Sequence, residues 1–267
     1  MVDLTALLTD LATESDQLDA LVAPLPPPEW ARPTPAAGWT IAHQIAHLAW
    51  TDHVARLAAT DADAFYASVT SAPDPARLVD DGAESFLAPP ATLLDRWRDG
   101  RSALAAALAA VPAGEKLPWY GTRMSSASMA TARIMETWAH GEDVAEALGV
   151  TRPATERLRH IAFLGFRTLG HSFAAHGRAV PTTPVRVELV APTGETWTFG
   201  PADAADRVVG PAVDFCLLVT QRRHRADLAL VATGPVADGW LDVAQAFAGP
   251  PGTGRPPHAD GTEVSAR

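Results

Sequence analysis

The stretch Trp39-Thr-Ile-Ala-His-Gln-Ile-Ala-His-Leu-Ala-Trp50 places His43 and His47 four residues apart in an apolar run. A second stretch, Glu136-Thr-Trp-Ala-His140, has a carboxylate and an imidazole at the same spacing. Residues four apart share one face of a helix. If the two helices face each other, His47, Glu136 and His140 converge. Two imidazoles and one carboxylate suit zinc or another divalent metal, with one position left open for water or substrate.

The histidine pair on the first helix allows a second ligand set. His43, His47 and His140 could hold the metal, which would leave Glu136 free to act as a base. With the first set, His43 would instead line the pocket or orient a ligand or substrate. His43 is therefore a candidate catalytic residue in either arrangement.

The bulk composition limits the classes of function. The chain has 267 residues, 47% of them hydrophobic and 19% charged, which predicts a packed core. Its formal net charge of -10 argues against binding to nucleic acid or to an anionic membrane surface. The single cysteine, Cys216, fits a reducing compartment, and neither a signal peptide nor an apolar run of about 18 residues is visible. We expect a cytoplasmic protein with a small-molecule substrate.

The first part of the chain predicts a four-helix bundle with a site in its core. The expected helices cover residues 3–23, 39–60 and 91–111, and a fourth runs from a cap at Ser125, Ser126 or Ser128 to about Leu148. Residues 61–88 are expected to be irregular with one or two small helices, and residues 112–124 to form a loop.

The second part predicts a mixed fold. A helix is expected from Pro153 to about His176, and Val185–Val190 and Thr196–Phe199 alternate as the strands of a hairpin. Residues 211–221 and Val236–Phe247 are expected to be helical, with a strand at Leu228–Thr233. The fold class is therefore α+β, with domains at 1–150 and 151–250 and a flexible tail at 251–267.

Several of these motifs resemble a known family. The combination of Gly38-Trp39, Ala46-His47-Leu48, Glu136-x-x-x-His140-x-x-Asp143 and Leu148-Gly149 resembles the DinB-like metal-binding bundle. It is most similar to the N-terminal domain of mycothiol-dependent maleylpyruvate isomerases, which carry a small sterol-carrier-like α+β domain after the bundle. The ending Trp240-Leu-x-x-Ala-Gln-Ala-Phe-Ala-Gly-Pro-Pro251 resembles an actinobacterial metal-binding subgroup.

The resemblance implies a ligand set and a chemistry. His47, Glu136 and His140 match the family's metal ligands, and the metal, Zn²⁺ or another divalent ion, would activate the sulfur of mycothiol. A divalent cation lowers the pKa of a bound thiol enough to ionise it near neutral pH. The thiolate could then add to a substrate double bond or displace a leaving group. We expect an isomerase or a transferase.

Other side chains are candidates for secondary roles. Arg123 and Trp138 are candidate contacts of the thiol cofactor, although Trp138 also suits the core and Arg123 the surface. Arg222 and Arg223 lie in a basic cluster, and in the resembled isomerase an arginine of the second domain faces the active site. Either could bind an anionic substrate in bidentate fashion. Cys216 is expected to be a buried apolar residue rather than a nucleophile.

Four polar residues near the ligand candidates could be exposed to solvent, and three of them have a second interpretation. Asp52 could accept a hydrogen bond from a ligand's second ring nitrogen, and Asp143 could hold the tautomer of His140. Arg133, like Arg123, could contact a carboxylate. For His53, we expect exposure to solvent.

Three classes of function remain open. The first is a thiol-dependent metal enzyme, and the second is a metal enzyme that hydrolyses or rearranges a specialised metabolite without a thiol. The third is a small-molecule-binding protein with a structural metal, which a fourth protein ligand would favour. Because such bundles often dimerise, a homodimer is also expected.

Overall fold

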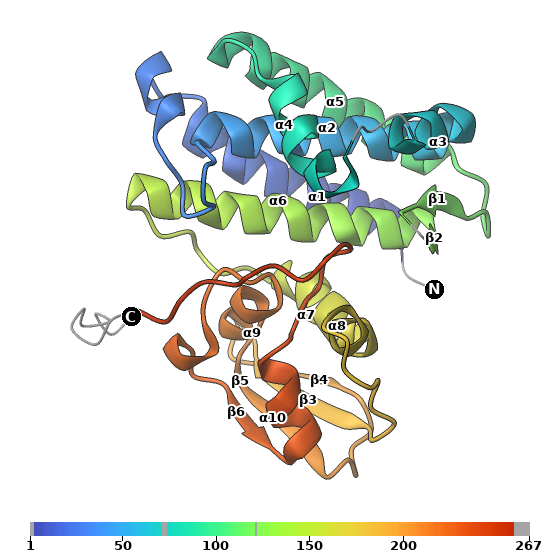
Figure 1. Ribbon diagram of the computed structural model, residues 1–267, viewed down its shortest axis with the longest axis vertical. Coiled ribbons are helices and arrows are strands. Elements are labelled where there is room, and N and C mark those ends of the chain that lie inside the picture. The colour runs from blue at the N-terminus through green and yellow to red at the C-terminus, as the bar shows by residue number, and fades with distance from the viewer. Residues whose placement is uncertain (1–2, 71–73, 121, 259–267) are drawn as a thin grey trace. The chain divides into compact units, whose positions relative to one another are not determined.

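The computed structural model describes residues 3–70, 74–120 and 122–258. The chain divides into two compact units, Met1–Arg152 and Pro153–Arg267, and each is described by itself (Figure 1). Helices dominate the first unit, whereas the second combines helices with a sheet. The expected α+β class is confirmed.

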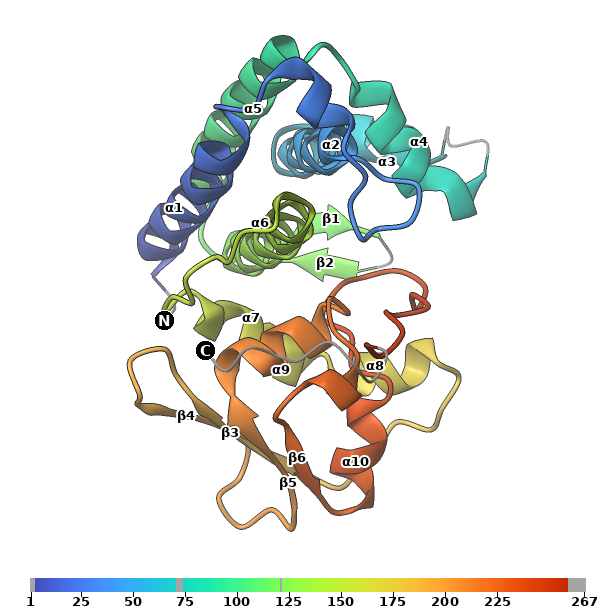
Figure 2. The same ribbon diagram turned by 90° about the vertical axis from the view of Figure 1, so that its left-hand side faces the viewer.

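Four long helices form the first unit. They are α1 (Leu4–Val22), α2 (Ile41–Thr60), α5 (Pro90–Ala110) and α6 (Ser126–Leu148), with the short elements η1 (Pro27–Ala31), α3 (Ala62–Thr70), η2 (Pro75–Arg77) and α4 (Leu78–Phe86) between them. α2 packs against α4, α5 and α6, and α1 packs against α5 and α6. Figure 2 shows α2 and α6 nearly end-on and side by side.

Local sequence sets the ends of these helices. The Asp3 carboxylate caps α1 by accepting from the backbone N–H of Thr5. Thr40 and His43 form a reciprocal capping box at the start of α2, and Ser125 caps α6. Gly149 ends α6 in the left-handed conformation, with φ 67°, which glycine adopts without steric cost. The capping of α6 by Ser125 decides among the three candidate serines.

The core of the bundle is apolar and closely packed. One cluster of the core joins α1, α2, α5 and α6 through fully buried side chains that include Leu18, Ile45, Trp97 and Val144. Burial of such side chains is the main contribution to the stability of the bundle.

The expected loop at residues 112–124 is partly wrong. Leu117–Trp119 (β1) pairs with Thr122–Met124 (β2) in an antiparallel ribbon. The ribbon is held by aromatic packing, because the Trp119 ring stacks on Phe65 of α3 at a centroid distance of 5.9 Å. This contact is long-range, so the local sequence contains no signal for it.

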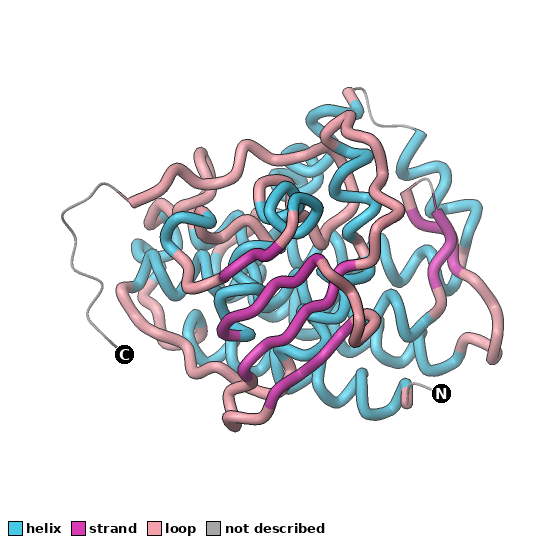
Figure 3. The backbone as a smooth tube through the Cα atoms, turned by 90° about the horizontal axis from the view of Figure 1, so that it is seen from below, coloured by secondary structure: helices cyan, strands magenta, loops and turns pink. Residues whose placement is uncertain are grey.

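The second unit contains a four-stranded sheet in the order β4-β3-β5-β6 (Figure 3). Its elements are α7 (Leu158–Arg167), α8 (Leu169–Ala175), β3 (Val185–Val190), β4 (Thr196–Phe199), β5 (Asp206–Pro211), α9 (Ala212–Val219), η3 (Arg225–Asp227), β6 (Val231–Thr233) and α10 (Pro235–Leu241). β3 pairs antiparallel with β4 and parallel with β5.

The hairpin of β3 and β4 is confirmed at its exact bounds, whereas other expected elements need correction. β5 was missed because its run Asp-Arg-Val-Val-Gly-Pro ends in two residues that strands disfavour. The helix expected from Pro153 begins at Leu158 and is interrupted at Thr168. The last strand and helix are shorter than expected, at Val231–Thr233 and Pro235–Leu241.

The sequence predicts a flexible tail from residue 251 onwards. Residues 251–258 form neither helix nor strand, and the backbone N–H and ring of His258 both contact the Asp227 carboxylate. Residues 259–267 lie outside the described part of the chain. In that part, no helix combines the length and the apolar composition needed to span a membrane.

Two glycine-to-alanine substitutions are expected to change stability in opposite directions. A Cβ atom on Gly82 of α4 would overlap the indole of Trp50, so Gly82→Ala should destabilise the protein by about 1–3 kcal/mol. At Gly100 of α5 the space is open, so Gly100→Ala should stabilise it by about 0.5–1 kcal/mol. Urea denaturation measures both effects, and a neutral Gly82→Ala would contradict the packing described here.

Candidate metal centre

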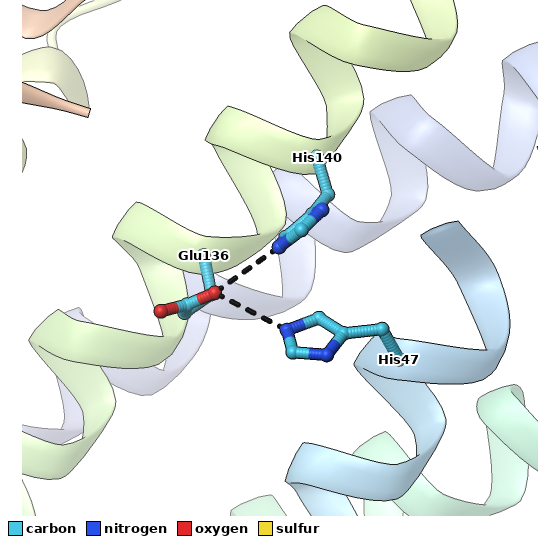
Figure 4. Close-up of side chains that lie close together, drawn as sticks. All are labelled: His47, Glu136 and His140. Carbon is cyan, nitrogen blue, oxygen red and sulfur yellow. Dashed lines mark ion pairs between the residues drawn. The ribbon is translucent and has the colours of Figure 1, made fainter. Parts of the chain in front are cut away.

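The facing sides of α2 and α6 bring His47, Glu136 and His140 together (Figure 4). The Glu136 Oε2 atom lies 3.5 Å from Nε2 of His47 and 3.2 Å from Nε2 of His140. The two imidazole rings are 4.5 Å apart between centroids. Among the described residues, these three form the one group of potential ligands whose donor atoms all lie within 4.8 Å of one another.

The spacing of these donor atoms fits a small divalent cation. Tetrahedral zinc has metal–ligand distances of about 2.0–2.2 Å, which separates neighbouring ligand atoms by about 3.3–3.6 Å. The two Glu136–histidine distances, 3.2 and 3.5 Å, lie within or close to this range. The donor set therefore suits zinc and related metals, and three protein ligands would leave a coordination position open.

The site is largely shielded from water but reachable from the side of the carboxylate. The side chains of His47 and His140 are 7% and 11% exposed, whereas that of Glu136 is 24% exposed. Burial by itself would raise the pKa of Glu136. The hydrogen bonds and positive charges that the two histidines can supply outweigh burial and hold the pKa of this carboxyl well below its usual range. Glu136 is thus an anionic ligand candidate at neutral pH.

His140 is oriented by a polar partner behind the ring. Its Nδ1 atom lies 2.5 Å from Oε1 of Gln44, which is completely buried on α2. Asp143, also buried, is 3.9 Å from the same nitrogen. Asp143 is therefore not exposed at the helix end, although Gln44 is the closer partner of the ring.

His47 is oriented by aromatic packing. Its ring packs against the indoles of Trp39 and Trp50, at centroid distances of 5.2 and 6.0 Å. Trp39 also stacks on His140, at 6.0 Å and an interplanar angle of 18°. The Trp39 indole N–H donates to the Asp80 carboxylate of α4 at 3.0 Å. Nδ1 of His47 is buried and has no hydrogen-bond partner among the described residues.

His43 lies beside the ligand group but is not part of it. Its Nδ1 atom accepts from the backbone N–H of Thr40 at 3.3 Å and lies 2.8 Å from the Thr40 hydroxyl. With Nδ1 as an acceptor, the proton of the neutral ring lies on Nε2, so neither nitrogen offers a free lone pair to a metal. The capping contacts therefore favour the ligand set with Glu136 over the set with His43, which is outside the convergent group.

Two expectations of surface exposure are wrong. Asp52 and Arg133 are buried, and the Nε atom of Arg133 donates to Oδ1 of Asp52 at 2.9 Å. Burial raises the pKa of Asp52, although the charge and hydrogen bond of Arg133 oppose this rise. The pair joins α2 to α6 near the ligand group. His53 is half-buried, with its ring 5.7 Å from that of Phe86.

The other candidates of the first unit lie where they can serve the fold. Trp138 is buried in the bundle. Arg123 is exposed on β2 and donates to the backbone carbonyl of Lys116. Their expected contact with a thiol cofactor stays a prediction.

In the second unit, the candidates lie around the end of α9. Cys216 is completely buried, as expected for an apolar residue. Arg222 donates to the backbone carbonyl of Thr220 at 2.7 Å, and Arg223 is half-buried beside it. A role for either arginine in binding an anionic substrate stays a prediction.

Sequence reasoning missed Gln44 and the contacts of Trp39. Gln44 lies three residues before His47 and therefore on a neighbouring part of the same helical face, which is a usable signal. Trp39 belongs to the same histidine-containing stretch, but its contact with Asp80 joins residues 41 positions apart. No local pattern predicts such a contact.

Comparison with known proteins agrees with this geometry. Residues 11–145, which contain α2 and α6 almost completely and all three ligand candidates, match the family model described as the mycothiol maleylpyruvate isomerase N-terminal domain. This chain belongs to that family. The suspected DinB-like relationship is thereby confirmed.

Other members and neighbours of the family span most of the chain. Two uncharacterized proteins of Mycobacterium tuberculosis, from strains CDC 1551 / Oshkosh and H37Rv, are 57% identical over 96% of this chain and 100% of their own length. The crystal structures of a mycothiol-dependent maleylpyruvate isomerase and of its histidine-to-alanine mutant share the fold, with TM-scores of 0.58 and 0.59. Both are 14% identical and cover 86% of this chain and 93% of the isomerase.

The second unit has a separate similarity. Residues 181–233, which contain the strands of the sheet, match the family model described as wyosine base formation. The expected sterol-carrier likeness of this unit stays a prediction.

Proposed function

We propose that this family member is a divalent-metal enzyme that uses mycothiol either to isomerise a small electrophilic metabolite or to transfer the thiol to it. The observation that carries the proposal is the convergence of His47, Glu136 and His140 with ligand-like spacing. Membership of a family described by a mycothiol-dependent isomerase supports the choice of thiol.

The chemistry follows from a charged metal next to sulfur. His47, Glu136 and His140 would hold the divalent cation, which when bound would lower the pKa of a thiol enough to supply a thiolate near neutral pH. In an isomerisation, the thiolate would add to a substrate double bond, the resulting single bond would rotate, and elimination would restore the double bond and release the thiolate. Electrons and atoms balance without an oxidant or reductant.

Glu136 and Trp39 have separate roles in this chemistry. Glu136 supplies one negative charge, and two neutral imidazoles add none, so the ligand set preserves a net positive charge at the metal. Trp39 covers the imidazole rings and limits the access of water on that side.

The test is turnover of maleylpyruvate with and without mycothiol. We expect activity in the zinc-loaded protein only when the thiol is present, loss of activity with a chelator, and loss in Glu136→Gln. Glu146→Gln, which makes the same change at an exposed position of α6, should keep the activity.

Two outcomes would contradict the proposal. Turnover that survives complete metal removal would reject a metal enzyme. Metal-dependent turnover without any thiol would favour direct hydrolysis or rearrangement by an activated water.

A further inference from the structure

A chain of three hydrogen bonds runs from a loop to the metal ligand His140. The Thr34 hydroxyl lies 2.9 Å from the backbone oxygen of Trp39, and Nε2 of Gln44 lies 2.8 Å from the Thr34 hydroxyl. Oε1 of Gln44 then lies 2.5 Å from Nδ1 of His140. The loop is closed by an antiparallel bridge between Pro33 and Thr40.

The carbonyl of Trp39, at one end of this series of hydrogen bonds, fixes which atom donates in each of them. The carbonyl of Trp39 can only accept, so the Thr34 hydroxyl must donate to it. With its proton committed, the hydroxyl accepts from the amide nitrogen of Gln44. The amide oxygen of Gln44 therefore faces His140 and requires a proton on Nδ1. The remaining nitrogen, Nε2, then carries the lone pair that points at the ligand group.

The opposite direction of these three hydrogen bonds is less favourable for metal binding by His140. Rotation of the Gln44 amide would turn the Thr34 hydroxyl toward Gln44 and break its bond to the Trp39 carbonyl. The amide nitrogen would then donate to Nδ1 of His140, and the proton would move to Nε2. A protonated Nε2 cannot bind a metal.

We propose that Gln44 is a positioning residue that selects the metal-binding tautomer of His140, with Thr34 fixing the direction of its amide. The inference rests on the metal site of the proposed function. A buried acceptor behind a ligating imidazole orients the ring and raises its basicity. His47, whose Nδ1 has no such partner among the described residues, depends instead on the two indoles that pack against it.

Zinc affinity of Gln44 variants tests the role. Gln44→Met keeps the length of the side chain and removes the acceptor, and should weaken zinc binding by about 10–100-fold. Gln44→Glu keeps an acceptor and makes it anionic, so its affinity should equal or exceed that of the wild type. Gln17→Met, the same change at a half-buried position of α1, is the matched control and should have no effect. Competition with a chromogenic chelator gives each dissociation constant.

The tautomer itself can be measured without any variant at position 44. In the zinc-loaded wild type, the ¹⁵N spectrum of His140, assigned by comparison with His140→Gln, should show a proton on Nδ1 and a coordinated Nε2. Zinc bound through Nδ1 would overturn the inference, and so would wild-type affinity in a folded Gln44→Met. If Gln44→Met does not fold, Thr34→Val should still weaken zinc binding, and wild-type affinity there would count against the inference.

Failure of the inference and failure of the proposed function give different results. A wild type that binds no zinc would overturn the metal site together with the role of Gln44. Zinc binding that is indifferent to Gln44, combined with thiol-dependent turnover, would overturn only the role of Gln44.

Discussion

Replacement of His47 by alanine is expected to lower zinc affinity on the order of a thousandfold. Structural zinc sites bind with about 10–16 kcal/mol, so loss of one of three protein ligands should cost roughly 4 kcal/mol. Glu136 and His140 lie on α6 and His47 on α2, so the variant also removes the one ligand candidate that α2 contributes to the group. Elemental analysis of the purified protein and chelator competition measure the loss.

A second histidine of α2 provides the control. His53→Ala removes an imidazole from the same helix, outside the ligand group, and should keep about one metal per chain. Equal metal content in His47→Ala and the wild type would show that another set of residues binds the metal. Absence of metal from the wild type after reconstitution with zinc would favour a small-molecule-binding protein over an enzyme.

Removal of the Asp52 carboxylate is expected to destabilise the bundle by about 3–5 kcal/mol, because it leaves the charge of Arg133 buried without its partner. The side chains of Asp52 and Arg133 are only 6% and 2% exposed, and Nη2 of Arg133 already lacks a hydrogen-bond partner in the described structure. Urea denaturation of metal-free Asp52→Ala measures the change in the free energy of unfolding.

The raised pKa of Asp52 refines this prediction. Burial raises the pKa of Asp52 despite the charge and hydrogen bond of Arg133, and a buried ion pair generally adds little net stability because desolvation offsets its attraction. Replacement of both partners, as Asp52→Leu with Arg133→Met, should therefore be far less harmful than Asp52→Ala alone. The exposed pair Arg77–Asp81 is the contrast, since Asp81→Ala should cost no more than about 1 kcal/mol. An Asp52→Ala variant as stable as the wild type would contradict a buried, charged pair.

The spacing of residues along each helix was readable from the sequence. Glu136 and His140 are neighbours on α6 because a helix has 3.6 residues per turn, whatever surrounds it. Thr40, Ser125 and Gly149 bound their helices through contacts within a few residues. The β3–β4 hairpin is equally local, and its bounds were predicted exactly.

Contacts between distant residues were not readable. β5 is a strand because it pairs in parallel with β3, and its own residues favour a strand only weakly. Arg133 and Asp52 are charged residues of the kind usually found at the surface, and only their mutual pairing, 81 positions apart, makes burial tolerable.

The sequence by itself therefore determined the helical bundle, the three ligand candidates and the family, since each depends on local spacing and residue type. Only the tertiary structure decided that Glu136 and His140 meet His47 and that Gln44 lies behind His140, whereas the capping contact of His43 is local. The physical reason is that a side chain with several possible partners takes the one that the packing of α2 against α6 brings within reach, and that packing is set by the whole core.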